Sequence, residues 1–458
     1  MARLAADRRR CCTRALPEVR PLTLSPRNRE LAFLIVVGVL TAVGFASVYI
    51  ARQDVVSTAS LTYAGFFFAL YIAAHLVTRY TVPFADPYLL PIAGLLTAIG
   101  LTEIYRLRPS DAFRQGIWIV VAVVLFAATL FLLQRDYRRI EAYKYLFGIT
   151  AIALLLLPIL PVIGLTVNGA RLWIHFGALR FQPGELAKIM LIVFLAGYMR
   201  EKREVLAQGR LKDWGPLLVI WVFAMLVLLE TRDLGGGLLY FGIFLAMLYV
   251  ATARIGYVAA GFGLFLIGAV GVWKITPHVQ DRVTIWLHPW TQHKVYCPLS
   301  GRPALRQDCQ SFQLVKSLYS IGNGQFAGTG LGKGTFASTG GHQIIPDLNT
   351  DFIYSALAQE LGLIGAAALL LVYMIFVLRG MRISLLAQDG FSKLAAAGLT
   401  FGFGLQTFII VGGILRLIPL TGITLPFVSY GGSSVVANFV LLAGLLLISN
   451  RANRELLR

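Results

Sequence analysis

Long apolar runs alternate with shorter polar segments along most of the chain, and this pattern predicts a bundle of membrane-spanning helices. A helix needs about 20 apolar residues to cross a hydrocarbon core about 30 Å thick. Runs of this kind recur twelve times, so we expect an all-α polytopic membrane protein with about 12 transmembrane helices. The predicted spans are 31–50, 61–77, 88–106, 115–133, 145–165, 184–199, 215–230, 236–253, 255–275, 352–378, 394–415 and 424–449.

The longest polar segment, residues 276–350, separates the ninth and tenth predicted spans. Most of the 41 Lys and Arg residues lie in tails and loops that a cytoplasmic N-terminus would also place in the cytoplasm. Cytoplasmic loops of membrane proteins carry an excess of these two residues. The charge pattern therefore predicts a protein of the cytoplasmic (inner) membrane with both termini in the cytoplasm and the 276–350 loop outside.

Composition supports the same class. Hydrophobic residues make up 57% of the chain, charged residues only 14%, and the mean hydropathy is +0.73, which excludes a soluble domain of 458 residues. The first 30 residues are rich in Arg and run directly into a full-length span, so we expect no cleaved signal peptide. Anchoring to anionic membrane lipids explains most of the net charge of +19, and no nucleic acid partner is expected.

Asp351 lies where the long polar loop meets the tenth predicted span. A carboxylate at the edge of a membrane bundle is costly unless it is solvated, paired or used, which makes Asp351 a candidate functional residue. The alternative is a simple helix cap, since Thr and Asp both cap helix N-termini well and an acid suits the positive end of the helix dipole. Taken alone, the residue is more typical of a cap, but the polar segments described below favour a functional role.

A second polar cluster interrupts the predicted outer face between the fifth and sixth spans. It runs from Asn168 to Ile174 and continues from Gln182 to Lys188. Glu185 and Lys188 are three residues apart, so they share one helix face and could form an ordinary ion pair. Burying both charges toward lipid would cost far more than such a pair returns. We therefore expect this helix to line a polar cavity.

The segment 419–434 packs two Pro, three Gly and five Ser or Thr residues around the start of the last predicted span. Irregular backbone at membrane depth is tolerated only where protein covers it or where it lines a cavity. The alternative is that its small residues serve close helix packing.

A glycine-rich run at 322–334 superficially resembles a nucleotide-binding loop. The Walker spacing would need Gly at position 327 and Ser or Thr at position 334, whereas the chain has Ala327 and Gly334. Backbone amides beside Lys333 could still bind another phosphate, such as a lipid pyrophosphate. A flexible hinge is the equal alternative.

Two of the four cysteines, Cys297 and Cys309, fall in the loop predicted to lie outside, and the other two lie in the basic N-terminal tail. An oxidising compartment favours a Cys297–Cys309 disulfide, which would stabilise the loop by about 3 kcal/mol through chain entropy. No spacing of Cys and His typical of a metal site is present, so no structural metal is expected.

Together these segments resemble the SEDS family (shape, elongation, division and sporulation), the peptidoglycan glycosyltransferases of the RodA, FtsW and SpoVE type. The resemblance covers roughly residues 88–450 and is strongest to the RodA-like proteins of actinobacteria. Its motifs are Asn168 to Lys188, the pattern around Gln313, Ile321, Gly322, Gly324, Gly328 and Gly330, then Thr350 to Gly362, and Pro419 to Ser433.

The resemblance implies a ten-span core preceded by two added spans. The domains that follow are a basic cytoplasmic tail (1–30), two additional spans (31–87), the membrane core (88–275 and 352–450), an extracytoplasmic loop (276–350) and a C-terminal cytoplasmic tail (451–458).

The chain departs from the usual family pattern at several positions, and none of them removes Asp351, the Glu185–Lys188 pair or the Ser-Tyr-Gly-Gly-Ser run. His288 occupies the place of an acid after the ninth span, so no role of that acid is carried over. The other departures are Gly184, Asn349, Gln359 and Ile410.

The resemblance implies polymerisation of lipid II, an undecaprenyl-pyrophosphate-linked disaccharide peptide, into glycan strands for cell elongation and shape. Asp351 corresponds to the proposed catalytic carboxylate of the family, and we assign it as the general base. A divalent cation, Mg²⁺ or Mn²⁺, bridging the pyrophosphate is compatible with this chemistry. The substrate-binding candidates are Glu185, Lys188, Arg171, Trp173, Gln182, Lys333, Glu360, Ser429, Tyr430 and Ser433.

Three alternatives remain open on sequence alone. A lipid II flippase would also need many spans and a polar cavity, although paired broken helices in inverted repeats would be expected. A division-type, FtsW-like polymerase or a sporulation enzyme would share the same motifs. A non-catalytic scaffold is disfavoured by Asp351.

The predicted outer loop has no Ser-x-x-Lys pair of the kind that transpeptidases use. The resemblance therefore implies a separate crosslinking partner, a class B penicillin-binding protein.

Overall fold

The computed structural model describes most of the chain. The described residues are 25–53, 58–161, 163–167, 170–176, 179–204, 222, 225–226, 230, 233–291, 294–297, 302–335 and 345–457. The seventh predicted span, 215–230, lies mainly outside them.

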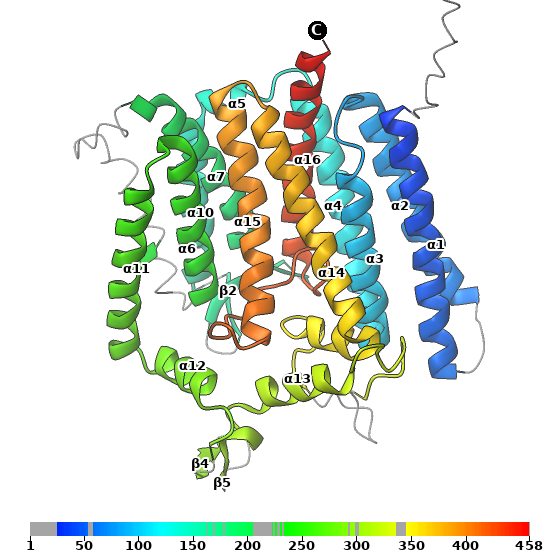
Figure 1. Cartoon of the computed structure of the whole chain (residues 1–458), viewed down its shortest axis with the longest axis vertical. Helices are drawn as coiled ribbons and strands as arrows, with labels where there is room; N and C mark the ends of the chain where they lie inside the picture. Colours follow the sequence, from blue (N-terminus) through cyan, green and yellow to red (C-terminus); the bar gives the residue numbers. More distant parts are fainter. Residues whose placement is uncertain are drawn as a thin grey trace, which may run out of the picture.

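Long helices form a bundle with a group of short helices and strands at one end, and the C-terminus lies at the other end (Figure 1). Among the described residues, eight helices are long and apolar enough to cross a membrane: α1, α3, α4, α10, α11, α14, α15 and α16. The predicted helical class is confirmed. The helices of the bundle are α1 (Pro26–Gln53), α2 (Thr58–Thr81), α3 (Leu89–Leu107), α4 (Pro109–Leu133), α5 (Arg139–Ala142), α6 (Lys144–Leu156), α7 (Pro183–Glu201), α10 (Leu234–Thr252), α11 (Ile255–Ile275), α14 (Ile353–Leu386), α15 (Gly390–Ile414) and α16 (Gly432–Leu456).

Helix α16 forms the centre of the bundle, where it packs against α4, α7 and α14. In an apolar stretch of 18 residues within α16, 89% of the residues are buried inside the protein. In the corresponding stretch of α11 none are buried. Helix α11 accordingly stands at the edge of the bundle beside α10 (Figure 1). The two N-terminal helices pack together and against α3 and α4.

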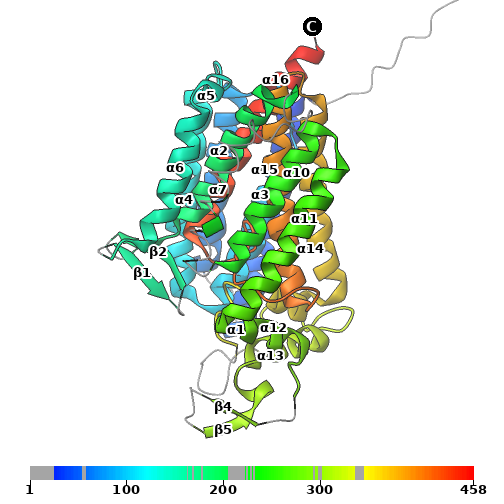
Figure 2. The same cartoon turned by 90° about the vertical axis from the view of Figure 1, so that its left-hand side faces the viewer.

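The short elements gather at the end opposite the C-terminus, as both views show (Figures 1 and 2). Strands β1, β2 and β3 form an antiparallel sheet in that order, in which Leu165 pairs with Trp173 and Ile174 with Phe181. The elements at this end are η1 (Leu157–Ile159), β1 (Gly164–Val167), β2 (Ala170–Phe176), β3 (Leu179–Phe181), α12 (Pro277–Leu287), β4 (Lys294–Cys297), β5 (Arg302–Leu305), η3 (Arg306–Asp308) and α13 (Phe312–Asn323).

The antiparallel pair β4–β5 projects farthest from the bundle and is closed by a disulfide (Figure 2). Cys297 and Cys309 are joined with their Cα atoms 5.7 Å apart. The bond ties the end of β4 to the residue that follows η3.

Two predicted spans differ from the observed helices. The span predicted at 145–165 is shorter, because α6 ends at Leu156 and gives way to a turn containing Pro158 and then to β1. A proline ring removes a backbone donor and clashes with the preceding turn of a helix. The last span was predicted to begin at 424, but α16 begins at Gly432. Residues 415–431 instead form a loop between α15 and α16. The two small sheets were not predicted.

Candidate active site

Asp351 lies in a tight turn just before α14, at the end of the bundle that carries the short elements. It does not cap this helix. The residue at the N-cap position is Phe352, and no side chain caps the helix there. The capping interpretation of Asp351 is therefore wrong for this structure, and its carboxylate is left for other contacts.

The environment of Asp351 disfavours its charged form. Burial raises the pKa of the Asp351 carboxyl to about 7, and the nearby carboxylate of Asp347 adds to the effect. The Arg282 guanidinium of α12 and the hydrogen bond from Thr350 act in the opposite direction but do not cancel it. A carboxyl group with a pKa close to neutral can accept and release a proton at physiological pH, which is what a general base requires.

The 415–431 loop holds the turn that carries Asp351. The hydroxyl of Ser429 donates to the Thr350 carbonyl at 2.5 Å and accepts from the Leu425 amide at 2.9 Å. The Tyr430 amide donates to the Asn349 carbonyl at 2.9 Å. Ser429 thus positions the Asp351 turn and also fixes the loop itself.

Gly422 of the same loop lies directly beside the Asp351 carboxylate. A Cβ atom at this position would be 3.5 Å from Oδ2 of Asp351, and the backbone φ of Gly422 is +75°. A positive φ is strained for most residues with a side chain. Glycine therefore lets the chain turn here close to the acid.

Glu185 and Lys188 lie at the start of α7 and form an ion pair of 2.8 Å. The Lys188 side chain is only 2% exposed, and its Nζ also donates to Gln406 of α15 at 2.6 Å. Gln406 in turn donates to the Thr424 carbonyl at 3.0 Å. The pair thus faces the protein interior rather than lipid, and it contacts the loop two residues from Gly422.

Sequence reasoning missed Asp233 and Arg282, which complete the charged environment of Asp351. Asp233 caps α10 by accepting from the Gly236 amide at 2.7 Å, and burial raises the pKa of its carboxyl, with Glu185 adding to the shift. Burial lowers the pKa of the Arg282 guanidinium, whereas Asp351 and Asp233 oppose that shift. One guanidinium thus lies within electrostatic range of both aspartates.

Arg282 also donates to the Leu420 carbonyl at 2.8 Å, so it anchors the start of the 415–431 loop. A signal for Asp233 was available, since an acid immediately before the apolar run that starts at Leu234 is typical of a helix N-cap. Nothing in the sequence pattern distinguished Arg282 from the other basic residues of its loop.

The three-stranded sheet carries two more of the predicted substrate-binding residues, and a third follows its last strand. Arg171 is exposed on β2 and donates to Thr166 at 3.2 Å, and Trp173 of the same strand is partly buried. Gln182 precedes α7, and its backbone amide donates to the Ser433 hydroxyl at 2.6 Å. Ser433 therefore ties the sheet to the start of α16, while Arg171 keeps its charge toward solvent.

Tyr430 is held among charged side chains beside the sheet. Burial raises the pKa of its hydroxyl, and Asp111 acts in the same direction. A hydrogen bond with Arg114 and the charge of Arg180 on β3 oppose the shift. The hydroxyl of this predicted substrate contact therefore lies within electrostatic range of two arginines.

The glycine-rich run is closed by internal hydrogen bonds. The amides of Gly328, Thr329 and Gly330 donate to backbone carbonyls, as does the amide of Lys333. The amides of Gly332 and Gly334 donate to the Glu360 carboxylate at 2.8 and 3.1 Å. These six amides are therefore already engaged within the protein, whereas the Lys333 side chain is exposed and available to an anion.

The Glu360 side chain anchors the glycine-rich run to α14. Its carboxylate is 1% exposed and pairs with Arg106 of α3 at 2.6 Å. It was predicted to contact substrate, but its oxygens are engaged by the loop and by Arg106. Glu360 is therefore a positioning residue for the glycine-rich run.

Gly362 allows this contact by interrupting α14. Its backbone φ is +68°, and a Cβ atom there would overlap the backbone of Phe326 and Gly328. The interruption lets the amide of Leu363 donate to the Gln325 carbonyl at 2.8 Å. The first turns of α14 and the glycine-rich run are thereby joined as one unit.

Among the described residues, no group of three His, Cys, Asp or Glu side chains is arranged to hold a metal ion.

Comparison with known proteins identifies the fold. The family model of the FtsW, RodA and SpoVE cell cycle proteins matches residues 88–454. The chain belongs to this family. The resemblance inferred from the motifs is confirmed, and helices α1 and α2 precede the region that the family model matches.

Relatives in this family are similar along nearly the whole chain. The peptidoglycan glycosyltransferase RodA of Mycobacterium tuberculosis (strain H37Rv) is 37% identical over 95% of this chain and 94% of its own length. Stage V sporulation protein E of Bacillus subtilis is 34% identical over 83% of this chain and 100% of its own length.

Two solved structures of family members have the same fold. A peptidoglycan synthase complex, described by its coordination of polymerization and crosslinking, matches with a TM-score of 0.65 at 26% identity, over 81% of this chain and 99% of that one. A mutant of the Thermus thermophilus rod shape determining protein RodA matches with a TM-score of 0.57 at 25% identity, over 80% and 97% of the two chains. The chain is thus a multi-pass membrane protein of the FtsW, RodA and SpoVE family.

Proposed function

We propose that this protein is a peptidoglycan glycosyltransferase that polymerises lipid II into glycan strands for cell elongation and shape. The observation that carries the proposal is Asp351, a carboxyl group with a pKa of about 7 in a turn held by the Ser429 loop. The family and the RodA relatives support the same activity.

The reaction is an inverting glycosyl transfer. The 4-hydroxyl of one lipid-linked N-acetylglucosamine attacks the anomeric carbon of a lipid-linked N-acetylmuramic acid on the face opposite the leaving group. Asp351 takes the hydroxyl proton as the new C–O bond forms, and the bond to undecaprenyl pyrophosphate breaks. The electron pair of that bond leaves with the pyrophosphate.

The departing pyrophosphate needs positive charge to stabilise it. Arg171, exposed on β2, and Lys333, exposed in the glycine-rich run, lie at the same end of the bundle and are our candidates to supply this charge. A divalent cation, Mg²⁺ or Mn²⁺, would supply further charge to the phosphates. We assign Glu185 and Lys188 to positioning, because their contacts run to the loop beside Asp351.

The proposed orientation places the end with the short elements outside the cytoplasmic membrane and both termini inside. The excess of Lys and Arg toward the other end supports this topology. We propose a core of ten spans, 88–275 with 352–450, and two added N-terminal spans within 31–87. The basic tail 1–30 and the tail 451–458 would then be cytoplasmic, and 276–350 extracytoplasmic.

The expected partner is a class B penicillin-binding protein, which would crosslink the strands that this protein makes. The similarity to a peptidoglycan synthase complex that coordinates polymerization and crosslinking supports the pairing. Confinement to one membrane raises the effective concentration of both proteins, so a weak interface suffices.

The decisive experiment is polymerisation of purified lipid II by the purified protein and by Asp351→Asn. We expect Asp351→Asn to lose polymerisation by at least about 100-fold, the usual contribution of a general base. The matched control is Asp347→Asn, because Asp347 is exposed in the same turn and its positive φ of 55° suits Asn.

Asp347→Asn should polymerise at close to the normal rate. Normal polymerisation by Asp351→Asn would rule out the proposed base. Movement of lipid II across vesicles without any polymer, by the unaltered protein, would instead favour a flippase.

A further inference from the structure

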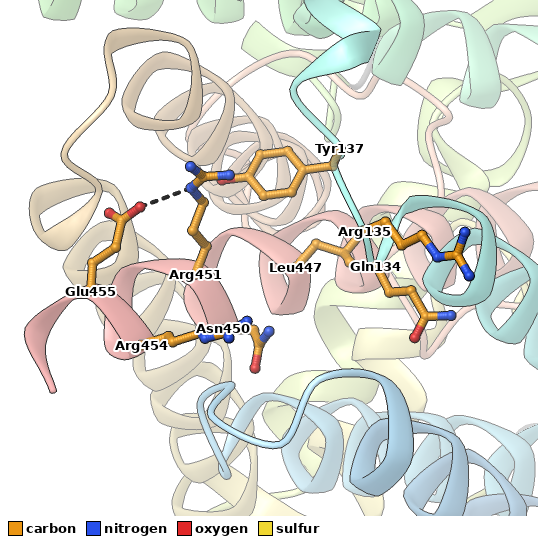
Figure 3. A pocket seen from close by; sticks show the side chains of 8 residues that line it. All are labelled: Gln134, Arg135, Tyr137, Leu447, Asn450, Arg451, Arg454 and Glu455. Carbon is orange, nitrogen blue, oxygen red and sulfur yellow. Dashed lines mark hydrogen bonds and ion pairs between the residues drawn. The ribbon is translucent and has the colours of Figure 1, made fainter. Parts of the chain in front are cut away.

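A basic cavity lies at the end of the bundle opposite the candidate active site, between the end of α4 and the last turns of α16. Its volume is about 180 Å³. The lining residues are Gln134, Arg135, Tyr137, Leu447, Asn450, Arg451, Arg454 and Glu455. Figure 3 shows the three arginine side chains spread around this cavity rather than in contact with one another.

The side chains around the cavity favour an anionic ligand. Arg451 is neutralised by Glu455, whose carboxylate lies 2.9 Å from its Nε. Among the residues that the structure describes, neither Arg135 nor Arg454 forms an ion pair, whereas Arg451 does. Gln134 and Asn450 add amide groups to the lining. The cavity therefore carries two uncompensated positive charges.

The cavity also lies at the boundary of the apolar part of the bundle. Helix α4 ends at Leu133, and the side chains just before that end are exposed: Phe131 by 52% and Leu132 by 80%. Leu447 of α16 contributes an apolar wall. Exposed apolar side chains next to cationic ones match the junction between lipid chains and headgroups.

We propose that this cavity binds the phosphodiester headgroup of an anionic phospholipid. About 180 Å³ is smaller than the roughly 300–1,000 Å³ of most small-molecule sites, so it suits a headgroup alone. The acyl chains then lie along Phe131 and Leu132 of α4. The proposed orientation places this lipid in the cytoplasmic leaflet, where basic pockets between transmembrane helices bind such headgroups.

The site is independent of the proposed polymerase activity. The cavity lies between the ends of α4 and α16, two helices that pack closely against each other. Tyr137, which lines the cavity, also forms a 2.6 Å hydrogen bond with Ser392 of α15. A bound headgroup would thus bridge two elements of the core at their cytoplasmic ends.

The test compares lipid retained by the purified protein in native mass spectrometry. The protein is equilibrated with phosphatidylglycerol or with phosphatidylcholine of identical chains. The double variant Arg135→Gln/Arg454→Gln should bind phosphatidylglycerol about 30-fold more weakly, from the contribution expected of two arginines near an anionic lipid. The variant Arg135→Lys/Arg454→Lys, which keeps both charges, should retain most of the binding.

The matched control is Arg382→Gln/Lys393→Gln, which removes two exposed charges at the same end of the bundle but outside the cavity. It should bind phosphatidylglycerol like the unaltered protein. An unchanged melting temperature of the double arginine variant would show that it still folds.

Equal loss in the control and cavity variants would overturn the proposal, since it would indicate only a general attraction of anionic lipid. Equal retention of phosphatidylcholine by the unaltered protein would also overturn it. If an acidic peptide, rather than either lipid, binds in a manner that depends on Arg135 and Arg454, the site belongs to a protein partner and the lipid assignment is wrong.

Discussion

At the residue scale, the candidate site consists of one acid surrounded by residues that hold it in place. Asp351 lies near Arg282 of α12 and near Gly422 and Ser429 of the 415–431 loop, two parts of the chain that are far apart in sequence. Sequence reasoning identified Asp351, Glu185 and the loop from their residue types. It could not identify Arg282, because what distinguishes it from other arginines is its position in space.

The pH dependence of polymerisation tests the role of Asp351. The base must be ionised, so the rate should rise about tenfold per pH unit below pH 7 and level off above it. Asp347→Asn should move the inflection to lower pH, because it removes a negative charge that raises the pKa of Asp351. The measurement is the initial rate of lipid II polymerisation on both sides of pH 7.

Arg282→Gln should shift the pH profile of polymerisation in the direction opposite to that of Asp347→Asn. Removing the guanidinium should move the inflection to higher pH, since its charge stabilises the Asp351 carboxylate. A pH profile that neither substitution shifts would assign the titration to another group.

The buried pair makes a prediction about stability. Lys188→Met should destabilise the protein by about 3–5 kcal/mol, because it leaves Glu185 buried without its cation. The double variant Glu185→Gln/Lys188→Met should recover much of that loss. Unfolding of the purified protein in a denaturant that retains detergent micelles measures both.

A surface pair serves as the control for this prediction. Lys144 and Glu201 are 2.6 Å apart, but the Glu201 side chain is 47% exposed. Lys144→Met should therefore cost only about 0–1 kcal/mol. Similar losses at the two lysines would contradict the buried role of Lys188.

At the element scale, apolar periodicity predicted the long helices, since burial in lipid or protein requires such runs in any case. It placed the start of the last span too early, at 424, because the apolar run 425–428 lies in the loop beside Asp351 and not in the helix. It also missed the β1–β3 sheet, whose strands are short and depend on pairing with one another. Pro158 was the one local signal that α6 would end early.

The projecting pair β4–β5 gives a prediction at this scale. Cys297 and Cys309 should resist alkylation in intact cells and react only after reduction, because they are joined in the structure. Mass spectrometry of alkylated peptides measures this directly. The Cys297→Ser/Cys309→Ser variant should loosen the hairpin but keep most polymerisation, since the hairpin projects away from the bundle (Figure 2).

Rapid labelling of both cysteines without reductant would show free thiols and contradict the disulfide. The other two cysteines, Cys11 and Cys12, provide an internal reference in the same sample, because they precede the first span in a tail expected to be reduced.

At the scale of the whole molecule, the candidate active site and the basic cavity lie at opposite ends of the bundle. In the proposed function, strand synthesis and crosslinking are divided between two proteins. We expect a class B penicillin-binding protein to co-purify in mild detergent and to raise the polymerisation rate when it is added.

In-cell crosslinking tests this pairing, with an unrelated single-span membrane protein as the control. Full polymerisation by this protein alone, together with no transpeptidase among the crosslinked products, would argue decisively against it.

The central position of α16 has a consequence for how the protein is made. The most buried of the candidate spans is also the last to leave the ribosome. The earlier helices must therefore enter the membrane before α16 has been synthesised. Until then, the space that α16 will occupy among α4, α7 and α14 is unfilled. Ribosomes that stop before residue 432 would release chains that insert but cannot close, and these are natural substrates for membrane quality-control proteases.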